Sequence, residues 1–212
     1  MIVVNLKAYD KAVGESSEEI IEACRKASDD TGKRVIVAPQ PEDLLRVDGV
    51  EAFAQHVDGV EPGSHTGSIL AKGVKDAGAS GTLINHSENR LQKKSIEASI
   101  NAAKSYGLET IVCAQSPEEC EKYSELKPDY IAFEPPELIG GDNPVSEAKP
   151  GLIKEAVERT REGVGTLTGA GIKSRKDVEK SIELGCEGVL VASGVVKAKD
   201  IYGEVKDLCE GL

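Results

Sequence analysis

Eight short apolar runs rich in β-branched residues recur along the 212-residue chain, and helical signals lie between most of them. The runs are almost continuously apolar, which is typical of strands covered on both faces. Strands that alternate with helices predict a parallel sheet of the α/β class. The expected strands are Ile2–Leu6, Val35–Ala38, Val50–Val57, Thr82–Asn85, Thr110–Ala114, Tyr130–Phe133, Gly165–Thr168 and Val189–Ala192.

The helical signals are start sites followed by apolar residues at helical spacing. Three of them have the pattern of a capping box, in which a serine is followed three residues later by an acid. A further helix is expected to begin at Pro150, since proline is favoured in the first turn. The stretches around Pro41–Val47 and Ile69–Ala77 leave room for small helices only. The three capping patterns are Ser16-Ser17-Glu18-Glu19, Ser116-Pro117-Glu118-Glu119 and Ser174-Arg175-Lys176-Asp177.

Eight strand–helix units without a linker or a low-complexity segment predict one domain over residues 1–212, folded as a closed (β/α)8 barrel. An open, doubly wound sheet is the alternative. Such barrels usually take about 250 residues, so shortened helices are expected. Apolar residues make up 39% of the chain, enough for a core, and with no Trp and two Phe this core must be built from Val, Ile, Leu and Ala.

The net charge limits the binding partners that can be expected, and the cysteine content indicates the cellular compartment. The formal net charge of −11 argues against nucleic acid or an anionic membrane as the main partner, but a local site can still bind a small anion. No window reaches transmembrane length, and Met1–Asn5 does not resemble a signal peptide. The five cysteines are odd in number and lack metal-ligand spacing. We therefore expect free thiols and a cytoplasmic protein.

Polar residues follow the expected strands, and in a barrel the loops after the strands meet at one catalytic face. Asn5 and Lys7 are two residues apart at the end of the first strand, so both are expected to point inward. His86 follows the fourth strand and Glu134 follows the sixth. Taken singly, these could be a solvated lysine, a core histidine and a turn cap. If the strand ends converge, they place a cation, an imidazole and a carboxylate together.

This combination suits proton abstraction next to a carbonyl group. The carboxylate would take the C–H proton while the imidazole and the ammonium stabilise the enediolate oxygen. Gly169-Ala170-Gly171 and Ala192-Ser193-Gly194 could bring backbone amides close to a phosphate. The stretch from Glu134 to Pro144 is expected to be a lid that excludes water. In this lid, Ile139 would make an apolar contact and the Gly140 N–H could reach the phosphate.

In chain order, these motifs resemble the triosephosphate isomerase family in its short archaeal form. The resemblance covers nearly the whole chain and implies a cofactor-independent isomerase, without a metal, on a TIM barrel. The implied reaction of glycolysis and gluconeogenesis interconverts dihydroxyacetone phosphate and D-glyceraldehyde 3-phosphate through an enediolate. The matching segments are Asn5-Leu6-Lys7, Asn85-His86-Ser87-Glu88, Phe133-Glu134-Pro135-Pro136-Glu137-Leu138-Ile139-Gly140, Thr168-Gly169-Ala170-Gly171 and Ala192-Ser193-Gly194.

The resemblance also implies residue roles. Glu134 would be the base, His86 the electrophile as a neutral imidazole, and Lys7 the cation that faces phosphate and enediolate. Asn5 would hold a substrate oxygen, and Glu88 would support Lys7. The expected phosphate and lid contacts are Ile139, Gly140, Gly171, Ala192 and Ser193. Two positions depart from the more familiar branch of the family. That branch has glycine at the position of Asn85, and its lid continues Gly-Thr-Gly where this chain has Gly140-Gly141-Asp142.

The loop Gly63-Ser64-His65-Thr66-Gly67 resembles the family's interface loop, which enters a neighbouring subunit near the catalytic lysine. With His65 and Thr66 in this role, a homo-oligomer is expected, either a tetramer or a dimer. The partner implied besides a second copy is the triose phosphate itself. Another phosphate-binding barrel enzyme and a non-catalytic relative remain alternatives. A metal-dependent enzyme is disfavoured because His56, His65 and His86 show no ligand spacing.

Overall fold

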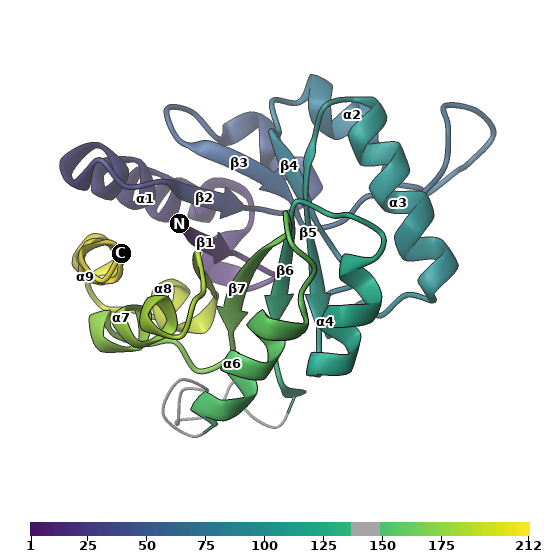
Figure 1. Cartoon of the computed structure of the whole chain (residues 1–212). Helices are drawn as coiled ribbons and strands as arrows, with labels where there is room; N and C mark the ends of the chain where they lie inside the picture. Colours follow the sequence, from purple (N-terminus) through teal and green to yellow (C-terminus); the bar gives the residue numbers. More distant parts are fainter. Residues whose placement is uncertain (137–148) are drawn as a thin grey trace.

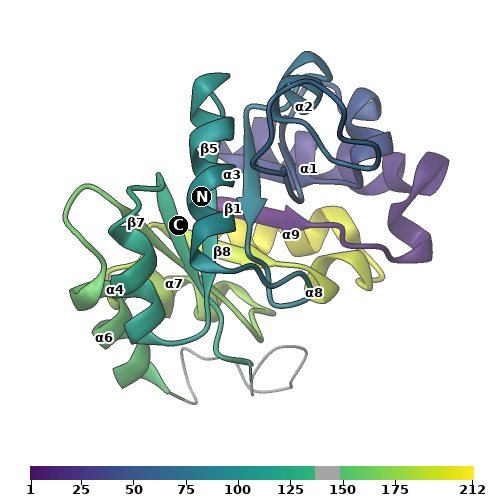
Figure 2. The ribbon, with the colours of Figure 1, turned by 90° about the vertical axis from the view of Figure 1, so that its right-hand side faces the viewer.

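The computed structural model describes residues 1–136 and 149–212. Eight parallel strands pair in chain order and β8 returns to β1, which closes the barrel. Figures 1 and 2 show the strands at the centre with the helices around them. This confirms the closed barrel and excludes the open sheet. The strands are β1 (Ile2–Asn5), β2 (Val35–Ala38), β3 (Glu51–Ala54), β4 (Gly81–Ile84), β5 (Glu109–Ala114), β6 (Tyr130–Phe133), β7 (Gly165–Gly169) and β8 (Gly188–Val191).

The helices that cover the barrel differ greatly in length. Those described are α1 (Glu18–Thr31), α2 (Ala71–Asp76), α3 (Lys93–Ser105), α4 (Pro117–Ser124), α6 (Pro150–Arg159), α7 (Arg175–Glu183), α8 (Ser193–Val196) and α9 (Ile201–Glu210). Only a 3₁₀ helix, Pro41–Arg46, follows β2, and the six-residue α2 precedes β4. The expectation of small helices in these two intervals is confirmed. Among the described residues, no helix is both long and apolar enough to span a bilayer.

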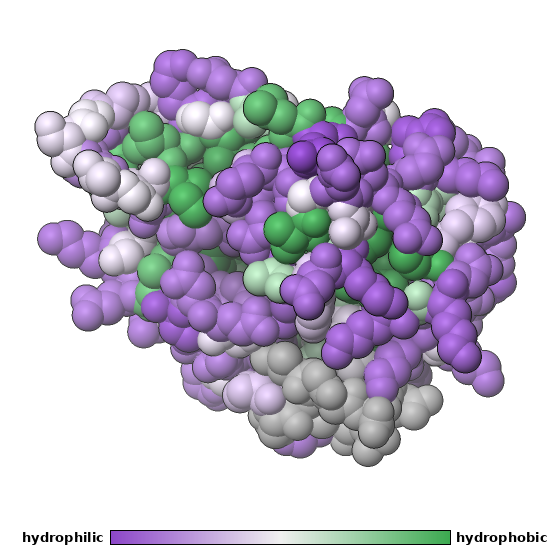
Figure 3. All heavy atoms as spheres, turned by 180° about the vertical axis from the view of Figure 1, so that it is seen from behind, coloured by the Kyte–Doolittle hydropathy of each residue, from purple (hydrophilic) through white to green (hydrophobic). Residues whose placement is uncertain are grey.

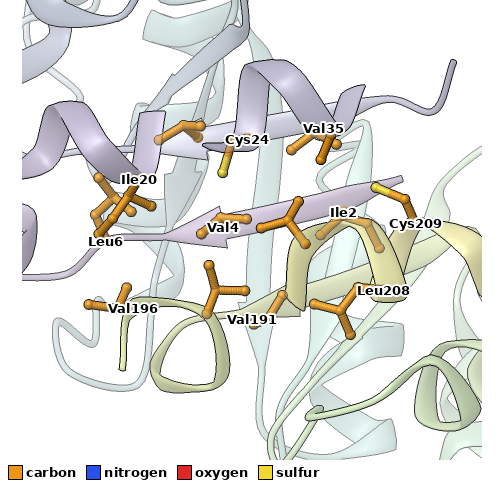
Figure 4. Packing of buried hydrophobic residues seen from close by; sticks show 14 of the residues in the cluster. Ile2, Val4, Leu6, Ile20, Cys24, Val35, Val191, Val196, Leu208 and Cys209 are labelled. Carbon is orange, nitrogen blue, oxygen red and sulfur yellow. The ribbon is translucent and has the colours of Figure 1, made fainter. Parts of the chain in front are cut away.

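Alternate residues of each strand face the barrel interior and the surrounding helices. Val3 lies in the interior cluster with Phe53 and Leu190. Ile2 and Val4, one residue to either side, pack outward against α1, α8 and α9. Figure 4 shows this outer layer, in which β1 lies between residues of these helices. The near-continuous apolar pattern of the strands therefore reflects burial on both faces, as expected.

The strand and helix starts differ from expectation at two places. The third strand is shorter than Val50–Val57 and ends at Ala54. The side-chain amide of the next residue, Gln55, donates to the Lys7 carbonyl after β1 and to the Ala38 carbonyl of β2. The capping box at Ser16–Glu19 is absent. A 3₁₀ turn over Gly14–Ser17 runs directly into α1, so Ser17 is helical and its hydroxyl donates to the Gly14 carbonyl. The boxes before α4 and α7 place their serines at the N-cap, as expected.

Candidate active site

A cavity of about 260 Å³ opens at the carboxyl ends of the strands. Small-molecule pockets usually measure roughly 300–1,000 Å³, so the cavity suits a small substrate. Eight of the residues predicted for the site line it together: Asn5, Lys7, His86, Glu88, Glu134, Gly171, Ala192 and Ser193. The loops after β1, β4, β6, β7 and β8 therefore converge, as the barrel hypothesis requires.

Lys7 is fixed by its backbone and paired through its side chain. It has a left-handed φ of 49°, and its N–H donates to Asn5 Oδ1 at 3.0 Å. Its carbonyl accepts from Gln40 Nε2 at 2.7 Å and from Gln55 Nε2 at 3.0 Å. The Nζ atom lies 2.8 Å from Glu88 Oε1. The ammonium is thus held in the cavity by a well-defined backbone and a partner carboxylate.

His86 presents one ring nitrogen to the cavity interior and uses the other within its own loop. The Glu88 N–H donates to Nδ1 at 3.2 Å. A nitrogen that accepts a hydrogen bond carries no proton, so the neutral tautomer bears its proton on Nε2. Nε2 lies 3.8 Å from Glu134 Oε2. The imidazole can therefore act as a neutral hydrogen-bond donor toward whatever lies between it and Glu134.

Glu134 directly follows β6, and its N–H extends the ladder by donating to the Ala114 carbonyl at 2.8 Å. The residue is only 6% exposed. Within the described part of the chain, its Oε2 atom is the one buried side-chain oxygen without a hydrogen-bond partner. A buried carboxylate oxygen is costly to leave without a partner. Such an atom in a cavity is poised to accept a proton from a bound molecule.

Gly169 is the last residue of β7, and because it has no side chain, the Glu134 side chain can occupy the space beside it. A Cβ atom at position 169 would lie 2.5 Å from Glu134 Oε1 and 2.6 Å from its Cγ. The next two residues, Ala170 and Gly171, both have left-handed φ values, 82° and 75°. Successive unusual backbone conformations of this kind turn N–H groups toward a common point, which suits an oxyanion. Gly169 thus has a different role from the backbone donor expected from the sequence.

Cys113 lies in the barrel interior and stays a thiol. It is 2% exposed and belongs to the interior cluster. Burial raises its pKa well above the usual value, and the nearby Glu134 charge adds to the increase. All five cysteines are free and buried. A neutral, buried thiol is a packing residue, so Cys113 is not a candidate nucleophile.

The remaining predicted residues lie elsewhere. His65 and Thr66 are exposed and are not among the residues that line the cavity. Ile139 and Gly140 fall outside the described residues. The sequence analysis did not single out Gln40, which holds the Lys7 carbonyl, or Tyr9 and Lys173, which line the cavity. For Gln40 a signal existed, since it follows β2 by two residues, at the same end of the barrel. In the described ranges, no group of three His, Cys, Asp or Glu residues is arranged to hold a metal.

Chemically, the cavity places a carboxylate opposite an imidazole N–H, with an ammonium beside them and a strained glycine loop at one side. Comparison with known proteins identifies the family of the chain. The family model described as triosephosphate isomerase matches residues 1–210. This chain belongs to the triosephosphate isomerase family.

Relatives within the triosephosphate isomerase family match this chain over nearly their whole length. The triosephosphate isomerase of Methanocaldococcus jannaschii is 46% identical, and the alignment covers 98% of both chains. That of Methanosarcina acetivorans is 45% identical, covering 98% of this chain and 96% of the relative. These proteins confirm the resemblance to the short archaeal form. The crystal structure of triosephosphate isomerase from Bartonella henselae superposes with a TM-score of 0.78 at 19% identity, covering 99% and 97% of the two chains, which supports the fold.

Proposed function

We propose that this protein interconverts dihydroxyacetone phosphate and D-glyceraldehyde 3-phosphate by moving one proton between adjacent carbons. The reaction follows from family membership over residues 1–210. The assignment of steps to residues rests on the cavity. Glu134 removes the proton from one substrate carbon and returns it to the other, while the hydroxyl proton passes from the oxygen of the first carbon to that of the second, so that the reaction balances without a cofactor.

His86 and Lys7 stabilise the enediolate that forms between the two proton transfers. The neutral imidazole donates from Nε2 to the developing oxyanion, while the Lys7 ammonium offsets its negative charge and that of the phosphate. The Asn5 side chain is held against the Lys7 N–H at 3.0 Å and keeps this cation in register. Gly171, Ala192 and Ser193 surround the phosphate end of the cavity.

The single observation that supports this assignment best is the geometry of Glu134 and His86. A buried carboxylate oxygen without a hydrogen-bond partner faces an imidazole nitrogen that carries a proton, across 3.8 Å. General bases and oxyanion donors must lie within hydrogen-bond reach of the same reacting atoms. A substrate that entered this gap would contact both groups.

The proposal is tested with purified protein in an assay coupled to consumption of the product. Wild type is expected to convert D-glyceraldehyde 3-phosphate rapidly. Glu134→Gln keeps the size of the side chain but cannot accept the proton, so its kcat should fall by at least about 10³-fold. Glu187→Gln, with the same chemical change at the far end of the barrel where β8 begins, is the matched control and should keep full activity.

Inactivity of folded wild type would overturn the proposed reaction. Conversion that survives Glu134→Gln would keep the reaction but remove Glu134 as its base. If triose phosphates bound without reacting, the protein would be a non-catalytic relative. Turnover of other sugar phosphates would indicate a different phosphate-binding barrel enzyme.

We infer that copies of this chain associate, as a tetramer or alternatively as a dimer, through the loop that contains His65 and Thr66. A second cavity, of about 360 Å³, opens beside Lys7 and is lined by Gln40, Gln55 and Ile69 among others. A loop from a second copy could fill this space. Figure 3 shows apolar residues gathered in patches on a mostly hydrophilic face, and Leu45 is 80% exposed. Exposed apolar patches often mark contact sites.

The proposed compartment rests on the state of the cysteines, and the proposed pathway rests on the reaction. Five free, buried cysteines suit a reducing environment, and the reaction belongs to glycolysis and gluconeogenesis. We therefore propose a cytoplasmic location. That residues 1–212 form a single domain stays a prediction from the sequence.

A further inference from the structure

Asn85 has an unusual backbone conformation at the point where the His86 loop begins. It directly follows β4, has a left-handed φ of 63°, and is 1% exposed. Few residues with a side chain adopt this conformation, and asparagine is one of them. Glycine would supply the same backbone at less cost. A side chain at this position therefore calls for a reason beyond the turn.

The Asn85 side chain uses both of its polar atoms in buried hydrogen bonds. Nδ2 donates to the Cys113 carbonyl of β5 at 2.8 Å. Oδ1 accepts from the Leu91 N–H at 2.9 Å. One amide thus ties the far end of the loop to its beginning and fastens both to the next strand.

The loop that Asn85 closes contains the atoms that orient His86. Within it, the Asn89 N–H donates to the His86 carbonyl at 2.8 Å, and the Glu88 N–H donates to Nδ1. Glu88 also pairs with Lys7. If residues 86–91 shifted as a unit, the imidazole, its proton-fixing donor and the partner of Lys7 would all move.

The strand that receives the clamp is the one next to the base. Cys113 pairs with Ala132 in the β5–β6 ladder, and Glu134 lies two residues beyond Ala132 on the same face. The Asn85–Cys113 hydrogen bond therefore connects the loop that carries His86 to β5, the strand that pairs with the one before Glu134. Its length helps to set the 3.8 Å separation of His86 Nε2 and Glu134 Oε2.

We propose that Asn85 is a positioning residue, whose side-chain clamp on Leu91 and Cys113 holds the His86 imidazole at the distance from Glu134 that enediolate stabilisation requires. It touches no reacting atom and acts through His86. This inference rests on the proposed isomerase function and deepens it.

Two variants separate the clamp from the turn. Asn85→Gly keeps the left-handed backbone and removes both hydrogen bonds. Asn85→Asp keeps the acceptor for the Leu91 N–H but replaces the donor with a carboxylate oxygen that faces the Cys113 carbonyl. The matched control is Asp129→Ala, which removes another, partly buried clamp, since Asp129 Oδ2 accepts from the Thr110 N–H and hydroxyl at 2.8 Å at the opposite end of the barrel.

The readout is the relative affinity for two phosphate ligands, measured by competitive inhibition. Phosphoglycolate carries a carboxylate where the enediolate oxygens would lie, whereas glycerol 3-phosphate shares only the phosphate and hydroxyl groups. In Asn85→Gly, we expect kcat to fall about 10- to 100-fold with a small change in KM. Phosphoglycolate binding should weaken about tenfold more than glycerol 3-phosphate binding. Asn85→Asp should be impaired at least as much as Asn85→Gly, because it loses the same donor and adds repulsion between two oxygens in a buried position.

Asp129→Ala should lower the melting temperature without changing the ratio of the two affinities. The inference is overturned if the Asn85 variants keep wild-type kcat, or if both ligands weaken equally, as a merely structural role predicts. If Asn85→Gly does not fold, Asn85→Asp decides by the same criteria. Failure of the proposed function is distinguishable, because then wild type itself would show no isomerase activity.

Discussion

At the scale of single residues, unusual backbone conformations gather at the site. Among the described residues, four other than glycine have a left-handed φ, and three of these, Lys7, Asn85 and Ala170, lie at or beside the cavity. Such conformations cost free energy and persist where surrounding contacts enforce them. Here the enforcing contacts are hydrogen bonds: the Gln40 and Gln55 amides hold the Lys7 carbonyl, and the Asn85 side chain clamps its own loop.

The first prediction concerns Gly169, because the space above it is occupied by the carboxylate of Glu134, the proposed base. In Gly169→Ala, the new Cβ would lie 2.5 Å from Glu134 Oε1, so the carboxylate must move. A displacement of about 1 Å can cost roughly 10²-fold in rate. We therefore expect kcat to fall by about 10²-fold in a steady-state assay, while the protein remains folded by circular dichroism.

The control is Gly151→Ala, in α6, where an added Cβ meets nothing within 4 Å. Alanine also favours the helix relative to glycine, so this variant should keep activity and stability. Equal activity of Gly169→Ala and wild type would show that Glu134 does not need its present position.

The sequence could indicate those site residues whose side-chain type and position after a strand already suggest a function. Lys7, His86 and Glu134 are polar residues directly after apolar strands, and barrel topology alone brings them together. The role of Gly169 could not be read in this way, since it depends on how closely β7 approaches the Glu134 side chain. The clamp made by Asn85 depends likewise on a contact with Cys113, 28 positions away.

At the scale of elements, the sequence predicted the strands and the helix starts, but one cap differs. The strands are apolar on both faces, so their burial is visible in the composition of each run. The first helix begins within Ser16–Glu19 as predicted, but the capping box is absent there because a 3₁₀ turn precedes α1. The Gly14 N–H donates to Asp43 Oδ2 at 2.8 Å, which caps this turn from a distant segment. A tertiary contact of this kind overrides a local capping signal.

The second prediction concerns Arg34, which clamps the strand starts at the end of the barrel opposite the site. Its guanidinium contacts Glu51 of β3 at 2.8 and 2.7 Å and Glu109 of β5 at 2.7 Å. Ser80 adds a hydrogen bond to Glu51 at 2.8 Å. The hydrogen bond from Arg34 lowers the pKa of the Glu51 carboxyl below its ordinary value of 4.5. The clamp therefore depends on pH.

Because the folded-state pKa of Glu51 is below its unfolded value, the clamp stabilises fully above pH 4.5 and is lost as pH falls through the folded pKa. We expect Glu51→Gln to lower the free energy of unfolding by about 1–2 kcal/mol near pH 7. The difference from wild type should shrink as the pH falls below 4.5, through the lowered folded-state pKa. Urea unfolding at several pH values measures this, and activity at pH 7 should be unchanged.

An exposed ion pair provides the comparison for this clamp. Lys72 and Asp76 pair along α2 on the surface. Since exposed pairs contribute little to stability, Asp76→Asn should leave the unfolding curve at its wild-type position. If Glu51→Gln behaved like Asp76→Asn at every pH, the Arg34 clamp would not stabilise the barrel.

At the scale of the whole molecule, the cavity does not share the acidity of the chain. The chain has a net charge of −11, whereas the lysines of the cavity lining, Lys7 and Lys173, balance its two glutamates beside backbone turns that suit an anion. The surplus of acids lies on the outer helices, where it favours solubility. The overall charge thus argues against nucleic acid as the main partner without bearing on a phosphorylated substrate, which depends on the local arrangement.

The last prediction concerns assembly. We expect the exposed loop of one copy to enter the second cavity of another copy. That cavity lies beside Lys7 and shares Asn5, His86 and Glu88 with the site. A loop from a second copy that filled it would exclude water next to the Lys7 ammonium, the cation of the proposed site. We therefore expect wild type to sediment at four times the chain mass of 22.4 kDa, or at twice that mass for the dimer.

Thr66→Arg should disrupt this association, because a bulky cation at the loop tip would meet Lys7 of the second copy. Its mass in sedimentation equilibrium should fall toward that of one chain, and its kcat/KM should fall with it. Asn101→Arg, an equal change on the exposed side of α3, is the control and should keep both. Wild type that sedimented as a monomer, or a Thr66→Arg protein that kept wild-type mass, would show that this loop does not join subunits.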